Sequence, residues 1–518
     1  MLPPEAPFSR RRGNYDTGGR PLRINYLDCY QVFTGEERVR GYTNVNFLCH
    51  TALQRRYPRK MTQLDEAIAR YHRILESEPY RDLRWVKNLQ DEMEARQLSA
   101  GGRLLCPFLR PNFVTQKQYD NLVKTGEALV SAVDRMLRLA LASPQLLSRM
   151  QLFPAEKMLA AIDPGYEMSE VSAQLDLQIQ NGSLHVLQYN ADALSGAAYA
   201  EGLSDLFYDC PPVKEFRRRY NLTRVGGKKP FLSALLKAYK MFGVGKGAGA
   251  AGQGRNPNIG ILEFRSATGR SEYEIFREYF RAEGFQTELI APDQLEYKNG
   301  VLRANGFDID LIYRRISAQE FLLRFTLNHP LVQAYQDHNV CIVNSFRSEL
   351  SHKKAMFALL TEDALVARFP LHERKAIKEH VPWTRVVKAG KATYQEETVD
   401  LLEFIKQNRE KLVLRPNDEY TDLHSFVGFE HDDGAWARAI REAQRAPYVV
   451  QERVVPTRTL FPLMSYGHLE FKEMQVDVQP QAYLGKVASC SSYVSSEGAG
   501  TYSPASGIAP TFIIDTKA

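Results

Sequence analysis

Cysteine is scarce in this sequence and shows none of the spacings that give it a structural role. Only six cysteines stand in 518 residues, and no two of them form a C-x-x-C pair. This spacing excludes a zinc site of the usual kind and gives no sign of a disulfide framework. Reduced thiols are typical of the cytoplasm, so we expect a cytoplasmic protein.

Long apolar runs and hydrolase motifs are also missing. No stretch reaches the roughly 18 consecutive apolar residues of a membrane helix, and the opening MLPPEAPFSRRRGNYDTGG has no apolar core of a signal peptide. We therefore expect no membrane partner. The sequence also lacks a G-x-S-x-G elbow and a convincing Ser/His/Asp or Cys/His set, and His185 and His352 have no partners at ligand spacing. A hydrolase therefore has no support.

The charge of the chain is nearly balanced. It has 67 Lys and Arg against 61 Asp and Glu, a formal net charge of +6. That excess is compatible with a small anionic ligand and does not indicate nucleic-acid binding. The length exceeds what one hydrophobic core usually serves, so we expect two to four structural units in an ordinary soluble composition.

The apolar pattern predicts helices first and a parallel sheet later. Helices are expected from about Thr62 and from Thr115 to just before Pro144, because apolar residues recur there at helical spacing. Short apolar runs alternating with a helix predict a parallel sheet with covering helices. These runs are 258–264, 287–290, 308–315 and 340–346, and the helix is 271–284. From Leu350 we expect a helix that carries Lys353 and Lys354, and after it strands and turns with few helices.

One low-complexity segment, MFGVGKGAGAAGQGRNPN, surrounds Lys246 with glycines. A phosphate-binding loop would need G-x-x-x-x-G-K-[ST] between a strand and a helix, whereas Gly247 follows Lys246 and a helical run precedes it. The segment, residues 246–256, is therefore interpreted as a flexible linker.

A hairpin with unusual polar residues is predicted in LDLQIQNGSLHVLQYNADALSG, residues 175–196. Asn181-Gly182 is a strong signal for a tight turn between two antiparallel strands. Alternation places Gln188, Asn190 and Asp192 on one face of the second strand, and pairing across the turn brings Asp176 near them. The face is either a solvated outer surface, which spacing alone favours, or an oxygen-rich site for Mg²⁺.

Eight segments together resemble the circularly permuted ATP-grasp proteins, whose relatives include the glutathionylspermidine synthetases. They are LQYNAD, DLIYRRI, SHKKAMFALL, VPWTR, LRPNDEY, YVVQERV and the final GKVAS with APTFII. The resemblance spans most of residues 110–515, and the joint order of the motifs is more specific than any one of them. In ordinary ATP-grasp enzymes the metal-binding strands close the chain, whereas here the matching segment precedes the parallel sheet.

The resemblance implies an α/β and α+β fold, namely a permuted ATP-grasp fold with a parallel-sheet pre-ATP-grasp domain and a helical N-terminal region. The implied segments are listed here: 1–110, irregular and helical; 111–245, helices and the metal-strand hairpin; 246–256, linker; 257–345, pre-ATP-grasp domain; 346–518, the rest of the ATP-grasp domain. Such enzymes phosphorylate a carboxylate with ATP and Mg²⁺ and let an amine attack the acyl phosphate. Small-molecule carboxylates and amines would be the substrates, and a protein partner stays open.

The resemblance also implies site residues. The metal ligands of the family map onto Asp176, Gln188 and Asn190. The nucleotide side maps onto the following residues: Lys353, Lys354, Arg415, Asn417, Gln451, Glu452 and Arg453, with the backbone of the YVVQERV strand facing the adenine edge. Lys353 and Lys354 are equally well explained as solvated cations.

Arg314 and Arg315 are assigned to substrate binding, as catalytic candidates, with structural pairing to acids as the alternative. Both end a buried strand, where arginines more often cap helices or pair with carboxylates than bind an anionic substrate.

Four departures from the family pattern affect this site. The family Glu is Gln188, an Arg two residues before the metal-binding Asp is Gln174, and the glycines of K-P-N-D-x-Y-G-G are Thr421 and Asp422. The fourth is the Arg expected after G-K-V-A, where the chain has Cys490, Ser491 and Ser492. These losses predict weak binding of ATP·Mg²⁺.

Two functions follow from the sequence. The first is an ATP-dependent carboxylate–amine ligase of the ATP-grasp type with weakened activity. The second is a degenerate ATP-grasp protein that keeps the fold, has lost turnover and serves as a binding or scaffold partner. The fold favours the first function, and the altered site favours the second.

Overall fold

The described part of the chain begins with a helical segment. The computed structural model describes residues 62–180, 182–194, 196–244, 256–265, 270–419, 424–496 and 506–516, and Gln63–Ala518 forms one unit. The first helices are α2 (Gln63–Glu76), α3 (Glu78–Arg81) and α4 (Arg84–Ala95), followed by the short pair β1 (Ser99–Ala100) and β2 (Arg103–Leu104). The helix expected from Thr62 is therefore confirmed.

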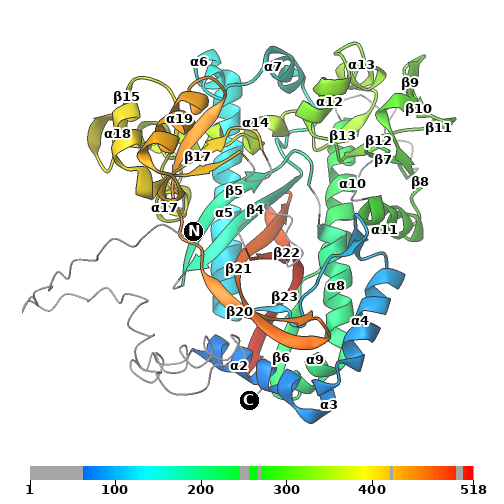
Figure 1. Cartoon of the computed structure of the whole chain (residues 1–518). Coiled ribbons are helices and arrows are strands. Elements are labelled where there is room, and N and C mark those ends of the chain that lie inside the picture. The colour runs from blue at the N-terminus through cyan, green and yellow to red at the C-terminus, as the bar shows by residue number, and fades with distance from the viewer. Residues whose placement is uncertain are drawn as a thin grey trace, which may run out of the picture. The chain divides into compact units, whose positions relative to one another are not determined.

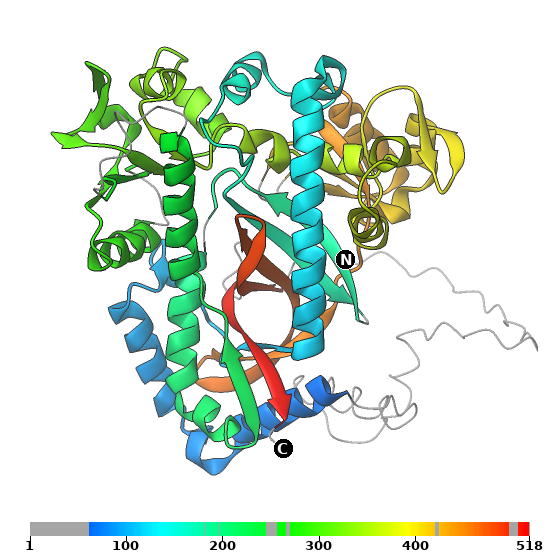
Figure 2. The same ribbon diagram turned by 180° about the vertical axis from the view of Figure 1, so that it is seen from behind.

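The helix predicted from Thr115 is also present. Helix α5 spans Gln116–Ala142, and the Thr115 hydroxyl accepts from the Gln118 amide N–H at 3.2 Å in a capping box. Its apolar stripe, including Leu122, Leu129 and Met136, is buried. The stripe packs against strands β21 (His468–Tyr483) and β22 (Lys486–Ser495), and Figure 2 shows this long helix in cyan.

The central sheet combines strands from both ends of the described chain. Its order is β3-β23-β22-β21-β4-β5, with β20 paired to β21 and β6 paired to β23. The remaining bounds are β3 (Asn112–Thr115), β4 (Ser172–Gln180), β5 (Ser183–Asn190), β6 (Tyr220–Arg224), β20 (Arg458–Ser465) and β23 (Gly507–Thr516). The predicted hairpin is the β4–β5 pair, and Figure 1 shows it beside the orange strands of the late chain.

A second sheet is parallel, as predicted. Its order is β13-β12-β7-β8, and all three strand pairs are parallel. The strands are β7 (Ile259–Leu262), β8 (Thr287–Ile290), β12 (Leu311–Arg314) and β13 (Cys341–Val343), and the predicted helix is α11 (Arg270–Ala282). A small antiparallel sheet lies between β8 and β12 in the sequence, with β9 (Leu295–Lys298), β10 (Val301–Ala304) and β11 (Phe307–Asp308).

The third sheet, antiparallel, is built from late residues. Its order is β14-β19-β17-β18, with β14 (Thr384–Val386), β17 (Leu412–Pro416), β18 (Phe426–Val427) and β19 (Tyr448–Glu452). A separate hairpin joins β15 (Lys391–Tyr394) to β16 (Glu397–Asp400). The helices in this region are α14 (Ser348–His352), α15 (Ala355–Leu360), α16 (Asp363–Val366), α17 (Leu371–His380), α18 (Leu401–Gln407) and α19 (Asp433–Ala443).

The helix expected from Leu350 ends at His352, before Lys353 and Lys354, and the expectation of few helices after it was wrong. Several of those helices are one or two turns long, and periodicity is hard to recognise over so few residues. The other helices in the described residues are α6 (Pro144–Ser148), α7 (Pro154–Ala161), α8 (Ala197–Asp209), α9 (Pro211–Phe216), α10 (Lys228–Val244), α12 (Ala318–Arg324) and α13 (Pro330–Gln336).

Some predictions concern residues outside the described ranges. These are nearly all of the glycine-rich linker, Thr421 and Asp422, and the first 61 residues. Within the described residues, no helix combines the length and the apolar character needed to cross a membrane.

Candidate functional site

The β4–β5 hairpin brings the three predicted metal ligands together. Asp176 lies opposite Gln188, and Asn190 lies opposite Gln174. Gly182 in the turn has φ of 85°, which glycine adopts without strain. Apolar side chains of the same strands, including Leu175 and Tyr189, pack into the core that contains α5. The polar side chains therefore share one face, as the alternation predicts.

Asp176 is held by amide groups on both carboxylate oxygens. Its Oδ1 accepts from Gln174 Nε2 at 3.1 Å and from Gln479 Nε2 at 2.9 Å, and its Oδ2 accepts from Asn190 Nδ2 at 3.2 Å. The Asn190 Oδ1 in turn accepts from Gln188 Nε2 at 2.7 Å. We call these five residues the amide cluster.

The amide cluster does not fit Mg²⁺. Magnesium is held by carboxylates together with phosphates and water, and Asp176 is the only acid in the cluster. Amide N–H groups point at both of its oxygens, so the positive ends of these dipoles lie where a cation would bind. Turning an amide over would exchange a donor for an acceptor, but it would add no negative charge. Burial also raises the pKa of Asp176, although the amide donors oppose that shift.

Arg415 joins the amide cluster to the third sheet. Its Nη2 lies 3.4 Å from Gln188 Oε1, and its Nη1 donates to the Leu187 carbonyl at 2.8 Å and to Gln451 Oε1 at 3.3 Å. The Leu187 carbonyl is available because the β4–β5 pairing is shifted by a bulge between Asp176 and Leu177. Strand β17 and the hairpin therefore meet at a buried guanidinium.

Lys354 approaches the same place from the loop before α15. Its Nζ donates to the Glu419 carbonyl, and that carbonyl also lies 3.5 Å from Gln188 Nε2. Of the two neighbouring lysines, Lys354 is the one that reaches the amide cluster. The structure thus brings Lys354, Arg415 and Gln451 together with the three predicted metal ligands.

Lys353 points elsewhere and is enclosed by acids. Its Nζ lies 3.2 Å from Glu156, 2.5 Å from Glu349 and 2.5 Å from Asp418. These three carboxylates could otherwise hold a metal ion, but the ammonium occupies their centre. Burial alone would lower the pKa of Lys353, and the acids raise it above its usual value. The alternative of Lys353 as a solvated cation was wrong, because the side chain is buried in this ion-pair network. Its assignment to the nucleotide side stays a prediction.

The other nucleotide candidates are engaged in local contacts. Asn417 accepts from the Ala355 N–H at 2.8 Å and donates to the Met150 carbonyl at 2.9 Å, so this buried side chain fixes the backbone.

Glu452 accepts from the Tyr394 hydroxyl at 3.2 Å, and the Arg453 guanidinium lies 4.0 Å from the Phe429 ring centroid. The backbone N–H groups of Glu452 and Arg453 already donate to Trp383 and Lys411 carbonyls, so these two N–H groups do not present an adenine edge.

Arg314 makes the structural pairing with an acid that was the alternative to its assignment as a catalytic candidate, and that assignment stays a prediction. It is fully buried and ion-paired to Asp192, and it donates to the Asn344 carbonyl at 3.0 Å and to Ser348 Oγ at 3.0 Å. Asp192 also accepts from the Ala318 N–H at 2.8 Å. Asp192 therefore belongs to this buried pair and not to the polar face of the hairpin, because β5 ends at Asn190.

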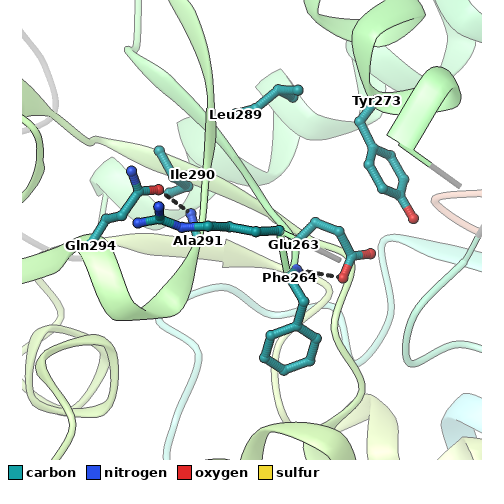
Figure 3. Close-up of a pocket in the computed structure, with 8 residues that line it drawn as sticks. Glu263, Phe264, Tyr273, Leu289, Ile290, Ala291 and Gln294 are labelled. Carbon is teal, nitrogen blue, oxygen red and sulfur yellow. Dashed lines mark hydrogen bonds between the residues drawn. The ribbon is translucent and has the colours of Figure 1, made fainter. Parts of the chain in front are cut away.

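Arg315 lies beside a small cavity at the end of the parallel sheet. It donates to the Tyr273 hydroxyl at 3.2 Å, while its Nε and Nη1 have no hydrogen-bond partner among the described residues. Tyr273 and Glu263 line the cavity of about 210 Å³ shown in Figure 3, where Glu263 accepts from the Phe264 N–H at 2.7 Å. Burial raises the pKa of Glu263, and Arg315 opposes that shift. Substrate binding by Arg315 stays a prediction.

The buried carboxyl group of Glu170 contacts Tyr189 on strand β5 of the hairpin. It accepts from the Tyr189 hydroxyl. Burial raises the pKa of Glu170 to about 7 from an ordinary value of 4.5. As the pH rises from 4.5 to 7, the unfolded chain loses this proton while the folded chain keeps it, so folding stability falls by about 3 kcal/mol.

We expect Glu170→Gln to remove this pH dependence. Urea unfolding between pH 4.5 and 8 should show the variant gaining stability relative to the wild type as the pH rises. Glu167→Gln, at an exposed neighbouring position, is the control and should follow the wild type. If the difference in unfolding free energy between Glu170→Gln and the wild type stayed the same from pH 4.5 to 8, the raised pKa of Glu170 would be contradicted.

The sequence reasoning missed Gln479 as a contact of Asp176. It lies 303 positions away from Asp176 in the sequence. The alternation Gln475, Asp477, Gln479 and Gln481 along β21 was the available signal, because period two places these polar groups on one face.

Comparison with solved structures identifies the fold. No protein-family model and no curated protein matches this chain. A glutathione synthetase-like effector from Globodera pallida, in apo form, covers 83% of this chain and 96% of its own, with 13% identity and a TM-score of 0.53. The chain therefore has an ATP-grasp-like fold, as the order of motifs predicts.

Two further solved structures align less well. A protein described as a gamma-glutamylcysteine synthetase, from Methylobacillus flagellatus, covers 76% of this chain and 86% of its own at 11% identity and TM-score 0.36. D-alanyl-alanine synthetase A from Vibrio cholerae covers 42% of this chain and 67% of its own, at 12% identity and a TM-score of 0.24.

Proposed function

We propose that this chain is a non-catalytic ligand-binding protein built on a circularly permuted ATP-grasp fold. The observation that carries the proposal is the amide cluster, in which amide donors contact both oxygens of Asp176 at 2.9–3.2 Å. ATP-grasp turnover needs metal ions to offset phosphate charge during transfer. A cluster with one acid and amide donors does not supply such a site.

The strand connections support the permuted order. The hairpin β4–β5 precedes the parallel sheet in the sequence, yet β4 pairs with β21, which follows that sheet. In this proposal, residues 111–245 and 346–518 build the ATP-grasp domain, and 257–345 form the pre-ATP-grasp domain.

An ATP-dependent carboxylate–amine ligase is the second candidate. It is favoured by Lys354 and Arg415, which place two cations next to the amide cluster. Cations in that position would offset charge on a transferring phosphoryl group. Small-molecule carboxylates and amines would then be the substrates.

Release of ADP separates the two candidates. The protein is incubated with ATP, Mg²⁺ and panels of amino acids, peptides and polyamines, and ADP is measured with a coupled enzyme assay. We expect no release above that of a heat-treated sample. Release that requires both Mg²⁺ and an amine would overturn the non-catalytic proposal and identify a ligase.

A further inference from the structure

We infer that residues 417–419 form an autoinhibitory strap, which closes the amide cluster and must move away before a ligand can reach it. The strap directly follows strand β17 (Leu412–Pro416). The inference rests on the proposed function, ligand binding, and adds its regulation.

The backbone carbonyl of Glu419 in the strap stands where a ligand oxygen would bind. It accepts from Lys354 Nζ, and it lies 3.5 Å from Gln188 Nε2. These two donors come from different elements, the loop before α15 and strand β5, and they converge on one oxygen of the strap. A ligand that approaches the amide cluster with a carbonyl, carboxylate or phosphate oxygen therefore competes with this carbonyl for the same donors.

Asn417 fixes the strap to the start of helix α15. Its backbone carbonyl accepts from the Lys354 N–H at 2.9 Å, and its side chain accepts from the Ala355 N–H at 2.8 Å. The first N–H groups of a helix have no partner inside the helix, so Asn417 caps α15 from outside. The same side chain donates to the Met150 carbonyl at 2.9 Å and is 1% exposed. Asn417 is therefore a specific anchor of the closed strap.

Asp418 fixes the middle of the strap through Lys353. The Lys353 Nζ lies 2.5 Å from Asp418, and Glu349 and Glu156 hold the same ammonium at 2.5 and 3.2 Å. Two of the three acids thus keep Lys353 in place, and the third connects it to the strap. The buried ion-pair network therefore has a role beyond local stability, because it holds the strap closed.

The amide cluster is closed in this arrangement. Gln188 is 4% exposed and Asn190 is 7% exposed, although β5 is the last strand in the order of the central sheet. The contacts named above that hold the strap are hydrogen bonds and one ion pair. Contacts of this kind can open locally while the core stays folded. A ligand then binds only the open state, and its apparent affinity falls by the fraction of molecules that are closed.

Thiol labelling of Gln188→Cys in the full chain measures the opening without any ligand. Position 188 contacts the strap, so a thiol there reacts with N-ethylmaleimide only when the strap is away. Mass spectrometry of the peptide that contains residue 188 separates this label from those on the native cysteines. We expect labelling in native buffer to be at least about a hundredfold slower than in urea, where the chain is unfolded.

Variants of the strap locate the effect. Asn417→Ala, added to Gln188→Cys, should speed labelling about ten- to a hundredfold, because it removes two side-chain hydrogen bonds. Asn328→Ala, at an exposed position between α12 and α13, is the matched control and should leave the labelling rate unchanged. Circular dichroism checks that each double variant is folded.

A second variant covers the case in which Asn417→Ala does not fold. Asp418→Asn keeps the shape of the side chain but removes its ion pair with Lys353. Added to Gln188→Cys, it should speed labelling about tenfold.

Two results would overturn the inference. One is labelling of Gln188→Cys that is as fast in native buffer as in urea, and the other is the control rate in a folded strap variant. Both leave the proposed function standing, because labelling needs no ligand. Turnover in the ADP assay would instead reject the proposed function and would not change the labelling rates.

Discussion

Lys353→Met is expected to lower the free energy of unfolding by about 3–5 kcal/mol, because removing one partner leaves buried charges uncompensated. The ammonium lies within 3.2 Å of Glu156 and within 2.5 Å of Glu349 and Asp418. Methionine fills a similar volume but leaves two buried carboxylates and the partly buried Asp418 to repel one another. Urea unfolding at pH 7.5 measures the loss.

A pH series strengthens this test. Burial raises the pKa values of Glu156 and Glu349, so these acids take up protons readily once the ammonium is gone. Lys353→Met should therefore approach wild-type stability as the pH falls toward 5. Lys87→Met is the control, since this lysine is 77% exposed and pairs with Asp91 at 2.9 Å; its effect should stay below about 0.5 kcal/mol. Unchanged stability together with lost ATP binding would return Lys353 to the nucleotide site.

The second large effect is expected from restoring the acidic site. Gln188→Glu, combined with Thr421→Gly and Asp422→Gly, adds a carboxylate beside Asp176 and removes a negative charge and two β-carbons from the LRPNDEYTDLHS segment. Each charged contact to phosphate or metal contributes about 1.5–3 kcal/mol. We expect Mg²⁺ to improve ATP affinity of this triple variant at least tenfold, measured by calorimetry with and without EDTA.

The control for the triple variant is Gln395→Glu, an added charge at an exposed position remote in sequence from the hairpin. It should show the same affinity in Mg²⁺ and in EDTA as the wild type. If the triple variant gains no response to Mg²⁺, the loss of the metal site extends beyond these positions. Restored ADP release would show that the catalytic geometry survives in the fold.

The main elements were predictable because their signals are local. Thr115 and Gln118 cap a long helix, Asn181-Gly182 marks the hairpin, and short apolar runs give the parallel sheet. Each of these patterns is complete within one segment of the sequence. The convergence of Asp176, Gln188 and Asn190 was likewise predictable, because the turn fixes the register of two adjacent strands.

The contacts of the site were less predictable because they join distant segments. Gln174 could be recognised as a missing arginine, but not as a donor to Asp176. The bulge that presents the Leu187 carbonyl to Arg415 has no sequence signal of its own. Lys353 and Lys354 are neighbours with opposite surroundings, and only the packing of α7, α14 and the 417–419 segment distinguishes them.

The strand order of the central sheet has a consequence during synthesis. The β4–β5 hairpin is made early, but its neighbour β21 is made much later, and Asp176 and Gln479 lie 303 positions apart. At about 5–20 residues per second, a ribosome needs roughly 15–60 s to cover that distance. Until then the hairpin has an unpaired edge and an apolar face without its final cover. We therefore expect nascent chains to be prone to aggregation during that interval, and slowing elongation should increase aggregation.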